Sequence, residues 1–131
     1  MSRILVIDDE PDMGQLVKDM LQPTGHEIIL AADGAEGVRQ SRSFHPDLAI
    51  TDIYMPNEDG LETILELRRL FPRMAIIAMS GRDNAEVMLS VAKKLGALAI
   101  LQKPFERERL IELVCQALGN GSVLPQETSD E

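Results

Sequence analysis

Hydrophobic and polar positions alternate in blocks along the chain up to about residue 118. Five short runs are rich in β-branched and aliphatic residues, and several of them are apolar at nearly every position. That pattern is typical of parallel strands that are buried on both faces. The predicted strands are residues 3–8, 27–31, 47–52, 74–80 and 97–103.

The longer stretches between the runs carry apolar residues three and four positions apart, as a helix with one apolar face does. Pro11 suits a first helical turn, and Gly25, Gly96 and Gly119 are placed to close helices. The predicted helices are residues 11–22, 34–44, 60–70, 84–95 and 106–118. A strand followed by a helix, repeated five times, predicts an α/β fold of the (βα)5 type: a doubly wound parallel five-stranded sheet with helices on both faces.

Polar residues follow four of the predicted strands. Asp8 ends the first strand and Asp9 follows it, Asp52 ends the third, Ser80 ends the fourth and Lys103 ends the fifth. Parallel strands end at the same edge of a sheet, and open α/β sheets bind ligands at that edge. In the common strand order 2-1-3-4-5 the first and third strands are neighbours, so we expect the three carboxylates to converge.

Three carboxylates in one crevice repel one another unless a cation joins them. Magnesium fits, because it is a hard ion that takes oxygen ligands and keeps several waters. The set holds no His or Cys, which argues against zinc. Lys103 is a cation of the kind that binds phosphate, and the Ser80 hydroxyl can donate to a phosphoryl oxygen. Phosphoryl transfer to a carboxylate oxygen needs these parts, because it depends on positioning and charge neutralisation.

Composition narrows the class of protein. The chain has 131 residues, which suits one domain, and a net charge of −9, which argues against nucleic-acid or anionic membrane surfaces. It holds no apolar run of membrane-spanning length and no signal-peptide pattern, so we expect a cytoplasmic protein.

Cys115 is the one cysteine, and we expect it to pack in a helix. Residues 120–131 are polar and acidic, so the predicted domain is residues 1–119, followed by a tail or linker stump.

Four motifs occur in order at the strand ends: "IDDE", "DIYMPNEDG", "MSG" and "LQKPF". Together they resemble the response-regulator receiver domains of two-component signalling, and the likeness spans residue 4 to about residue 118. The resemblance implies a flavodoxin-like fold and a phosphorylation-activated switch rather than an enzyme. It also implies a histidine kinase or phosphotransfer protein as donor, an effector that the sequence does not identify, and a monomer or a dimer through the fourth helix, fifth strand and fifth helix.

The resemblance assigns a role to each polar residue at the sheet edge. Asp52 would accept the phosphoryl group. Asp9 and Asp52 would bind Mg²⁺ directly and Asp8 through water, and the backbone carbonyl of Tyr54 would supply a further oxygen.

After phosphorylation, the Ser80 hydroxyl would bond a phosphoryl oxygen and Lys103 would pair with the phosphoryl group. The resemblance also implies a cis peptide bond between Lys103 and Pro104.

The sequence departs from the family at Ile100, where receivers usually carry an aromatic residue. Ile100 has a stiff side chain without a polar tip, so we expect activation to act through the backbone of the loop after Ser80 instead. Tyr54 and Arg82 stand where residues tune the loss of phosphate, and their bulk predicts a long-lived phosphoform.

Other readings of these residues exist. Asp8 and Asp9 suit helix capping before Pro11, and Glu10 suits a solvated acid at the helix entrance. His26 and His45 read as surface residues in loops.

Two other functions are also possible. One is a receiver-like interaction module without phosphorylation. The other is a magnesium-dependent phosphatase of the haloacid dehalogenase type, which needs a second acid two places after its nucleophile, where this chain has Tyr54.

Overall fold

The structure is a computed structural model, and it describes residues 2–55, 58–81 and 85–119. Five parallel strands form the main sheet in the order β2-β1-β3-β6-β7, which is the predicted order 2-1-3-4-5. The strands are β1 (Arg3–Ile7), β2 (Glu27–Ala31), β3 (Leu48–Asp52), β6 (Ala75–Ser80) and β7 (Ala99–Gln102). The predicted doubly wound fold is therefore confirmed.

A second, smaller sheet lies between β3 and the third helix. It pairs β4 (Tyr54–Met55) with β5 (Glu58–Asp59) in antiparallel fashion. The sequence predicts only a turn in this segment. Two-residue strands carry too short a pattern to be read from hydrophobic periodicity.

Five helices alternate with the strands of the main sheet. They are α1 (Pro11–Leu21), α2 (Gly34–Phe44), α3 (Gly60–Leu70), α4 (Ala85–Leu95) and α5 (Arg107–Ala117), with a 3-10 turn, η1 (Gln22–Thr24), after α1. Pro11 is the first residue of α1. Gly25, Gly96 and Gly119 have positive φ angles where η1, α4 and α5 end, as predicted.

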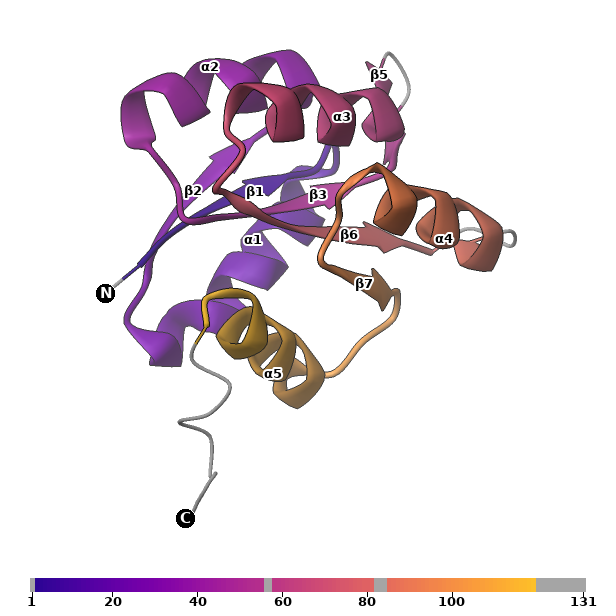
Figure 1. The fold of residues 1–131 in the computed structure, drawn as a ribbon. Helices are drawn as coiled ribbons and strands as arrows, with labels where there is room; N and C mark the ends of the chain where they lie inside the picture. The colour runs from indigo at the N-terminus through magenta and orange to yellow at the C-terminus, as the bar shows by residue number, and fades with distance from the viewer. Residues whose placement is uncertain (1, 56–57, 82–84, 120–131) are drawn as a thin grey trace.

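The helices form two layers that enclose the sheet. Helices α2, α3 and α4 pack side by side on one face, while α1 and α5 pack together on the other (Figure 1). β1 shows why residues 4–7 are all apolar: Leu5 and Ile7 belong to the core under α2 and α3, while Ile4 and Val6 belong to the core under α1 and α5. Within the described residues, no helix is both long and apolar enough to span a bilayer.

Cys115 and the end of the chain bear on two of the sequence predictions. Cys115 is partly buried in α5, and burial raises the pKa of its thiol, which disfavours the reactive thiolate. Residues 120–131 lie outside the described residues, so the tail and the domain limit at residue 119 stay predictions.

The two histidines differ. His45 is exposed just after α2, as predicted. His26 is half-buried, and its Nδ1 accepts a hydrogen bond of 3.1 Å from the backbone N–H of Ser2. His26 is therefore a surface residue in a loop, as predicted, but it is only partly exposed, because the loop before β2 packs against the start of β1.

Candidate functional site

Three carboxylates meet at the carboxyl edge of the sheet. β1 and β3 are parallel neighbours with Ile7 opposite Thr51, so Asp8 and Asp52, each one residue further on, lie side by side. Asp8, Asp9 and Asp52 each offer an oxygen within 4.8 Å of the others. Asp8 is 4% exposed and Asp52 is 5% exposed, whereas Asp9 is only partly buried. The predicted convergence of the three acids is found.

The local structure after β1 separates Asp8 from Glu10. The Asp8 carboxylate accepts a hydrogen bond of 2.9 Å from the backbone N–H of Glu10, two residues further along the chain. Glu10 is exposed at the N-cap of α1, and its own side chain makes no capping hydrogen bond. Glu10 is thus the solvated acid at the helix entrance that the sequence indicates, and Asp8 faces the site.

Lys103 reaches the carboxylates from the end of β7. Its Nζ lies 3.2 Å from Asp8 Oδ2 and 3.3 Å from Asp52 Oδ2, and its side chain is only 14% exposed. Burial lowers the pKa of Lys103, but the charges of Asp52 and Asp8 outweigh that effect, so its pKa is raised and the ammonium stays charged. One ammonium offsets one of three carboxylate charges, which leaves an excess of negative charge for a cation to balance.

Ser80 ends β6 on the other side of Asp52. β3 and β6 are parallel with Asp52 opposite Met79, which places the fully buried Ser80 one residue beyond Asp52. The backbone N–H of Lys103 donates to the Ser80 carbonyl at 2.8 Å. Four strand ends thus converge as the sequence predicts.

Gly60 holds the first turn of α3 against the site. A Cβ at Gly60 would lie 2.6 Å from the Asp52 carbonyl oxygen and still closer to Ile53 Cα. The same carbonyl accepts a hydrogen bond of 3.0 Å from the Thr51 hydroxyl, so it is already held in place. Sequence reasoning gave Gly60 no role, although its place at the end of "DIYMPNEDG" was a signal.

The remaining predicted site residues are placed in part. Tyr54 lies in β4, two residues after Asp52, and the Lys103–Pro104 bond is cis, as the resemblance implies. Arg82 lies outside the described residues. Ile100 is 37% exposed on β7.

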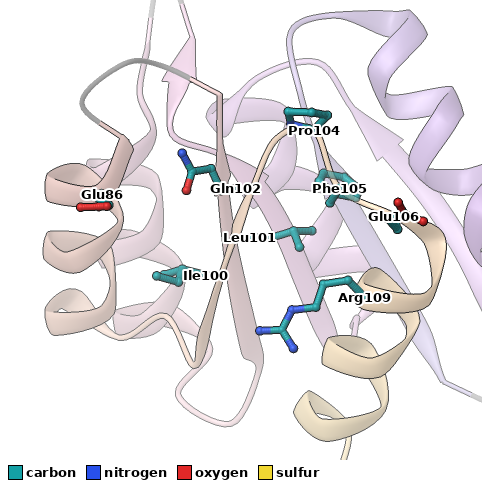
Figure 2. Close-up of a pocket in the computed structure, with 8 residues that line it drawn as sticks. All are labelled: Glu86, Ile100, Leu101, Gln102, Pro104, Phe105, Glu106 and Arg109. Carbon is teal, nitrogen blue, oxygen red and sulfur yellow. The ribbon is translucent and has the colours of Figure 1, made fainter.

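A pocket of about 450 Å³ opens beside Ile100, between α4 and α5. Figure 2 shows Glu86 on the α4 side, Arg109 on the α5 side, and Ile100 and Gln102 on β7 between them. The lining residues are Glu86, Ile100, Leu101, Gln102, Pro104, Phe105, Glu106 and Arg109. Because Pro104 follows Lys103 directly, this surface is one peptide bond away from the acidic site.

The donor set fits a hard divalent ion. Three carboxylate oxygens from two adjacent strand ends lie within 4.8 Å of one another, and none of these ligands is nitrogen or sulfur. Asp9, Asp52 and Asp8 are the residues that would hold Mg²⁺ here.

A sequence model of the response regulator receiver domain matches residues 4–115. The chain belongs to this family. Receiver domains are signalling switches of two-component systems rather than typical enzymes, and they interact with histidine kinases and downstream effectors.

Individual relatives agree with the receiver assignment. The chain is 32% identical over 117 residues to the chemotaxis protein CheY of Bacillus subtilis, covering 88% of this chain and 97% of that protein. It is also 32% identical over 117 residues to the nitrogen assimilation regulatory protein NtrX of Azorhizobium caulinodans, but covers 26% of it. This receiver domain therefore spans nearly all of one relative and about a quarter of the other.

Solved structures repeat the same pattern. The fold matches CheY4 of Vibrio cholerae with a TM-score of 0.82 and 29% identity, over 90% of this chain and 99% of that one. It matches NtrX of Brucella abortus with a TM-score of 0.85 and 31% identity, over 93% of this chain and 28% of that one.

Proposed function

We propose that this receiver domain is a phosphorylation-activated switch that accepts a phosphoryl group on Asp52. The observation that carries the proposal is the position of Asp52. Its carboxylate is almost fully buried, 3.3 Å from the Lys103 ammonium, and lies within 4.8 Å of oxygens of Asp8 and Asp9. A nucleophile, a cation and a further acid pair are thus assembled in one place.

The chemistry follows from these groups. An Asp52 carboxylate oxygen attacks the phosphorus of a phosphohistidine on a kinase or phosphotransfer protein. A P–O bond forms while the P–N bond breaks, and the imidazole leaves with the electron pair. Asp9, Asp52, the Tyr54 carbonyl and, through water, Asp8 are the groups that would hold Mg²⁺, and the ion would supply charge neutralisation at the transferred group.

Lys103 and Ser80 respond to the product. An acyl phosphate carries about two negative charges where the carboxylate carried one, so the Lys103 ammonium pairs more strongly with the phosphoryl oxygens than with Asp52. The Ser80 hydroxyl is at the next strand end and donates to a phosphoryl oxygen. Both residues lie next to surface elements: Lys103 precedes the pocket residue Pro104, and Ser80 precedes the loop to α4.

The output surface in this proposal is the face formed by α4, β7 and α5. It carries exposed Val87, Ile100 and the pocket of Figure 2. Phosphorylation shifts the populations of two states of this face, and a downstream effector or a second copy of the chain binds one of them.

Labelling with acetyl phosphate and Mg²⁺ tests the proposal. We expect intact-mass spectrometry to show one added phosphoryl group on the wild type and none on Asp52→Asn. Asp47→Asn is the matched control, because Asp47 is an exposed acid at the opposite end of β3. Asp9→Ala should need more Mg²⁺ to reach the same labelling.

Two results would contradict the proposal. An unlabelled wild type would favour an interaction module without phosphorylation. Continuous turnover of p-nitrophenyl phosphate that is lost in Asp52→Asn would favour the phosphatase.

A further inference from the structure

Arg68 joins the carboxyl ends of two helices, at the edge of the sheet opposite to the edge that carries the acidic site. It lies in the last turn of α3. Its Nη1 donates to the Pro72 carbonyl at 2.7 Å, and its Nη2 donates to the Gly96 carbonyl at 3.0 Å. Pro72 follows α3 and Gly96 follows α4, so one guanidinium joins both helix ends.

The packing around Gly96 is close. Gly96 has a φ of +127°, and a Cβ placed there would lie 2.9 Å from Arg68 Nε and 3.2 Å from Arg68 Cγ. The Arg68 side chain therefore lies directly against the turn that ends α4. Arginines near helix ends often bond the last carbonyls of their own helix. Here the rigid, planar fork bonds a carbonyl from each of two segments, which fixes one relative to the other.

The turn after α4 is also tied to the sheet. Leu98 N–H donates to the Ile76 carbonyl at 2.7 Å, and Ala97 N–H donates to the Ala92 carbonyl at 3.0 Å. Ala92 and Ala97 are both buried. The carboxyl end of α4 is thus held by α3 and β6, whereas its amino end follows Ser80 and the acidic site.

We propose that Arg68 is a positioning residue that makes the carboxyl end of α4 the fixed point of the switch. A change at Ser80 then displaces the first turns of α4 and the face around Ile100, instead of sliding the whole helix. The inference rests on the proposed function for its trigger. The tie between α3 and α4 does not depend on phosphorylation.

The first experiment measures that tie without any phosphate. Arg68→Met keeps an unbranched stem against Gly96 and removes both donors. Arg69→Met is the control, because Arg69 is exposed in the same turn and, within the described part of the chain, makes no hydrogen bond or ion pair. Arg68→Met removes two charge-assisted hydrogen bonds that hold this turn, so we expect amide exchange at Gly96 and Ala97 to be at least about tenfold faster in Arg68→Met alone. Equal exchange in the two variants would overturn the inference.

The second experiment adds beryllofluoride and Mg²⁺ as a phosphoryl mimic and follows backbone NMR shifts along α4. In the wild type and Arg69→Met, we expect shift changes to be large near residue 86 and small at Gly96 and Leu98. In Arg68→Met, changes at Gly96 and Leu98 should at least double. If Arg68→Met responds to beryllofluoride with the same shift changes along α4 as the wild type, the role of Arg68 as the fixed point is overturned and the proposed function is not. A wild type that does not respond would overturn the proposed function and the role of Arg68 with it.

Discussion

Asp8 and Asp52 share one ammonium, that of Lys103, in a site that is almost closed to water. A buried charge that loses its partner is strongly destabilising, whereas a paired one adds little to stability. At the residue scale, Lys103 and a divalent ion can therefore each supply the positive charge that the Asp8 and Asp52 carboxylates need.

Lys103→Met should destabilise the protein in the absence of magnesium. We expect a loss of about 1–3 kcal/mol in the free energy of unfolding, because two nearly buried carboxylates lose their counter-charge. Mg²⁺ should restore part of that loss, since a cation that binds only the folded state stabilises it. Urea unfolding with MgCl₂ or with EDTA measures both effects. Lys93→Met, in an exposed position of α4, is the control, and an equal loss with and without Mg²⁺ would contradict this account.

His26 gives the protein a pH dependence away from the acidic site. Burial, and after it the positive amino terminus, lowers the pKa of His26 from 6.5, while Asp47 opposes them. The folded state therefore binds this proton less readily than the unfolded chain. The stability it contributes is present above pH 6.5 and is lost as the pH falls from 6.5 through the lowered pKa. Protonation of Nδ1 would also break the hydrogen bond from Ser2.

His26→Asn tests this pH dependence, because the Asn amide oxygen can replace Nδ1 as acceptor without titrating. Between pH 7.5 and pH 5.5, about one unit either side of the usual His value, the wild type should lose stability relative to His26→Asn. Urea unfolding at the two pH values measures the difference, and carboxylate effects cancel between the two proteins. Parallel losses in both would exclude His26 as the cause.

At the scale of elements, the site depends on where strands end and helices begin. β1, β3, β6 and β7 each deliver one part of it, and α3 closes over it through Gly60. The hydrophobic pattern predicted these strands and helices because each buries one or two regular faces. It did not predict the pairing of β4 with β5, because strands of two residues are too short to show a period.

Gly60→Ala should disturb both stability and labelling. An added methyl has no room beside the Asp52 carbonyl and Ile53, and overpacking of this kind costs about 1–3 kcal/mol. Displacement of the Asp52 backbone should also slow phosphorylation by acetyl phosphate. Gly14→Ala is the matched control: its methyl would meet Leu30 at an ordinary 3.8 Å inside α1, where Ala is the better helix former. Thermal unfolding and labelling rates that are the same for both variants would contradict the close-contact argument.

At the scale of the whole molecule, the doubly wound sheet connects the acidic site to the face of α4, β7 and α5. Two connections are direct in sequence: Ser80 leads to α4, and Lys103 lies between the pocket residues Gln102 and Pro104. Arg68 holds α4 at its far end. A change at the site is therefore expected to reach one face of the molecule and to leave α1 and α2 unchanged.

Ile100 lacks the ring that receivers usually carry, so we expect phosphorylation to change this face through the backbone of the loop after Ser80. With beryllofluoride and Mg²⁺, we expect amide shift changes in residues 79–84 to exceed those of the Ile100 side-chain methyls. Ile100→Tyr provides the comparison, because it restores a ring at the same place. A loop that stays unchanged while the Ile100 methyls move would refute the prediction.

The sequence by itself determined the five strand–helix repeats, the strand ends that carry Asp8, Asp9, Asp52, Ser80 and Lys103, and the likeness to receivers. It could do so because burial imposes a period on each element, and because the polar residues stand where each buried run stops. Only the tertiary structure decided that Lys103 bridges Asp8 and Asp52, that Gly60 must be small, that His26 is half-buried and that Arg68 joins α3 to α4. These contacts join residues that are far apart in the chain or face a neighbouring backbone, so no local pattern records them.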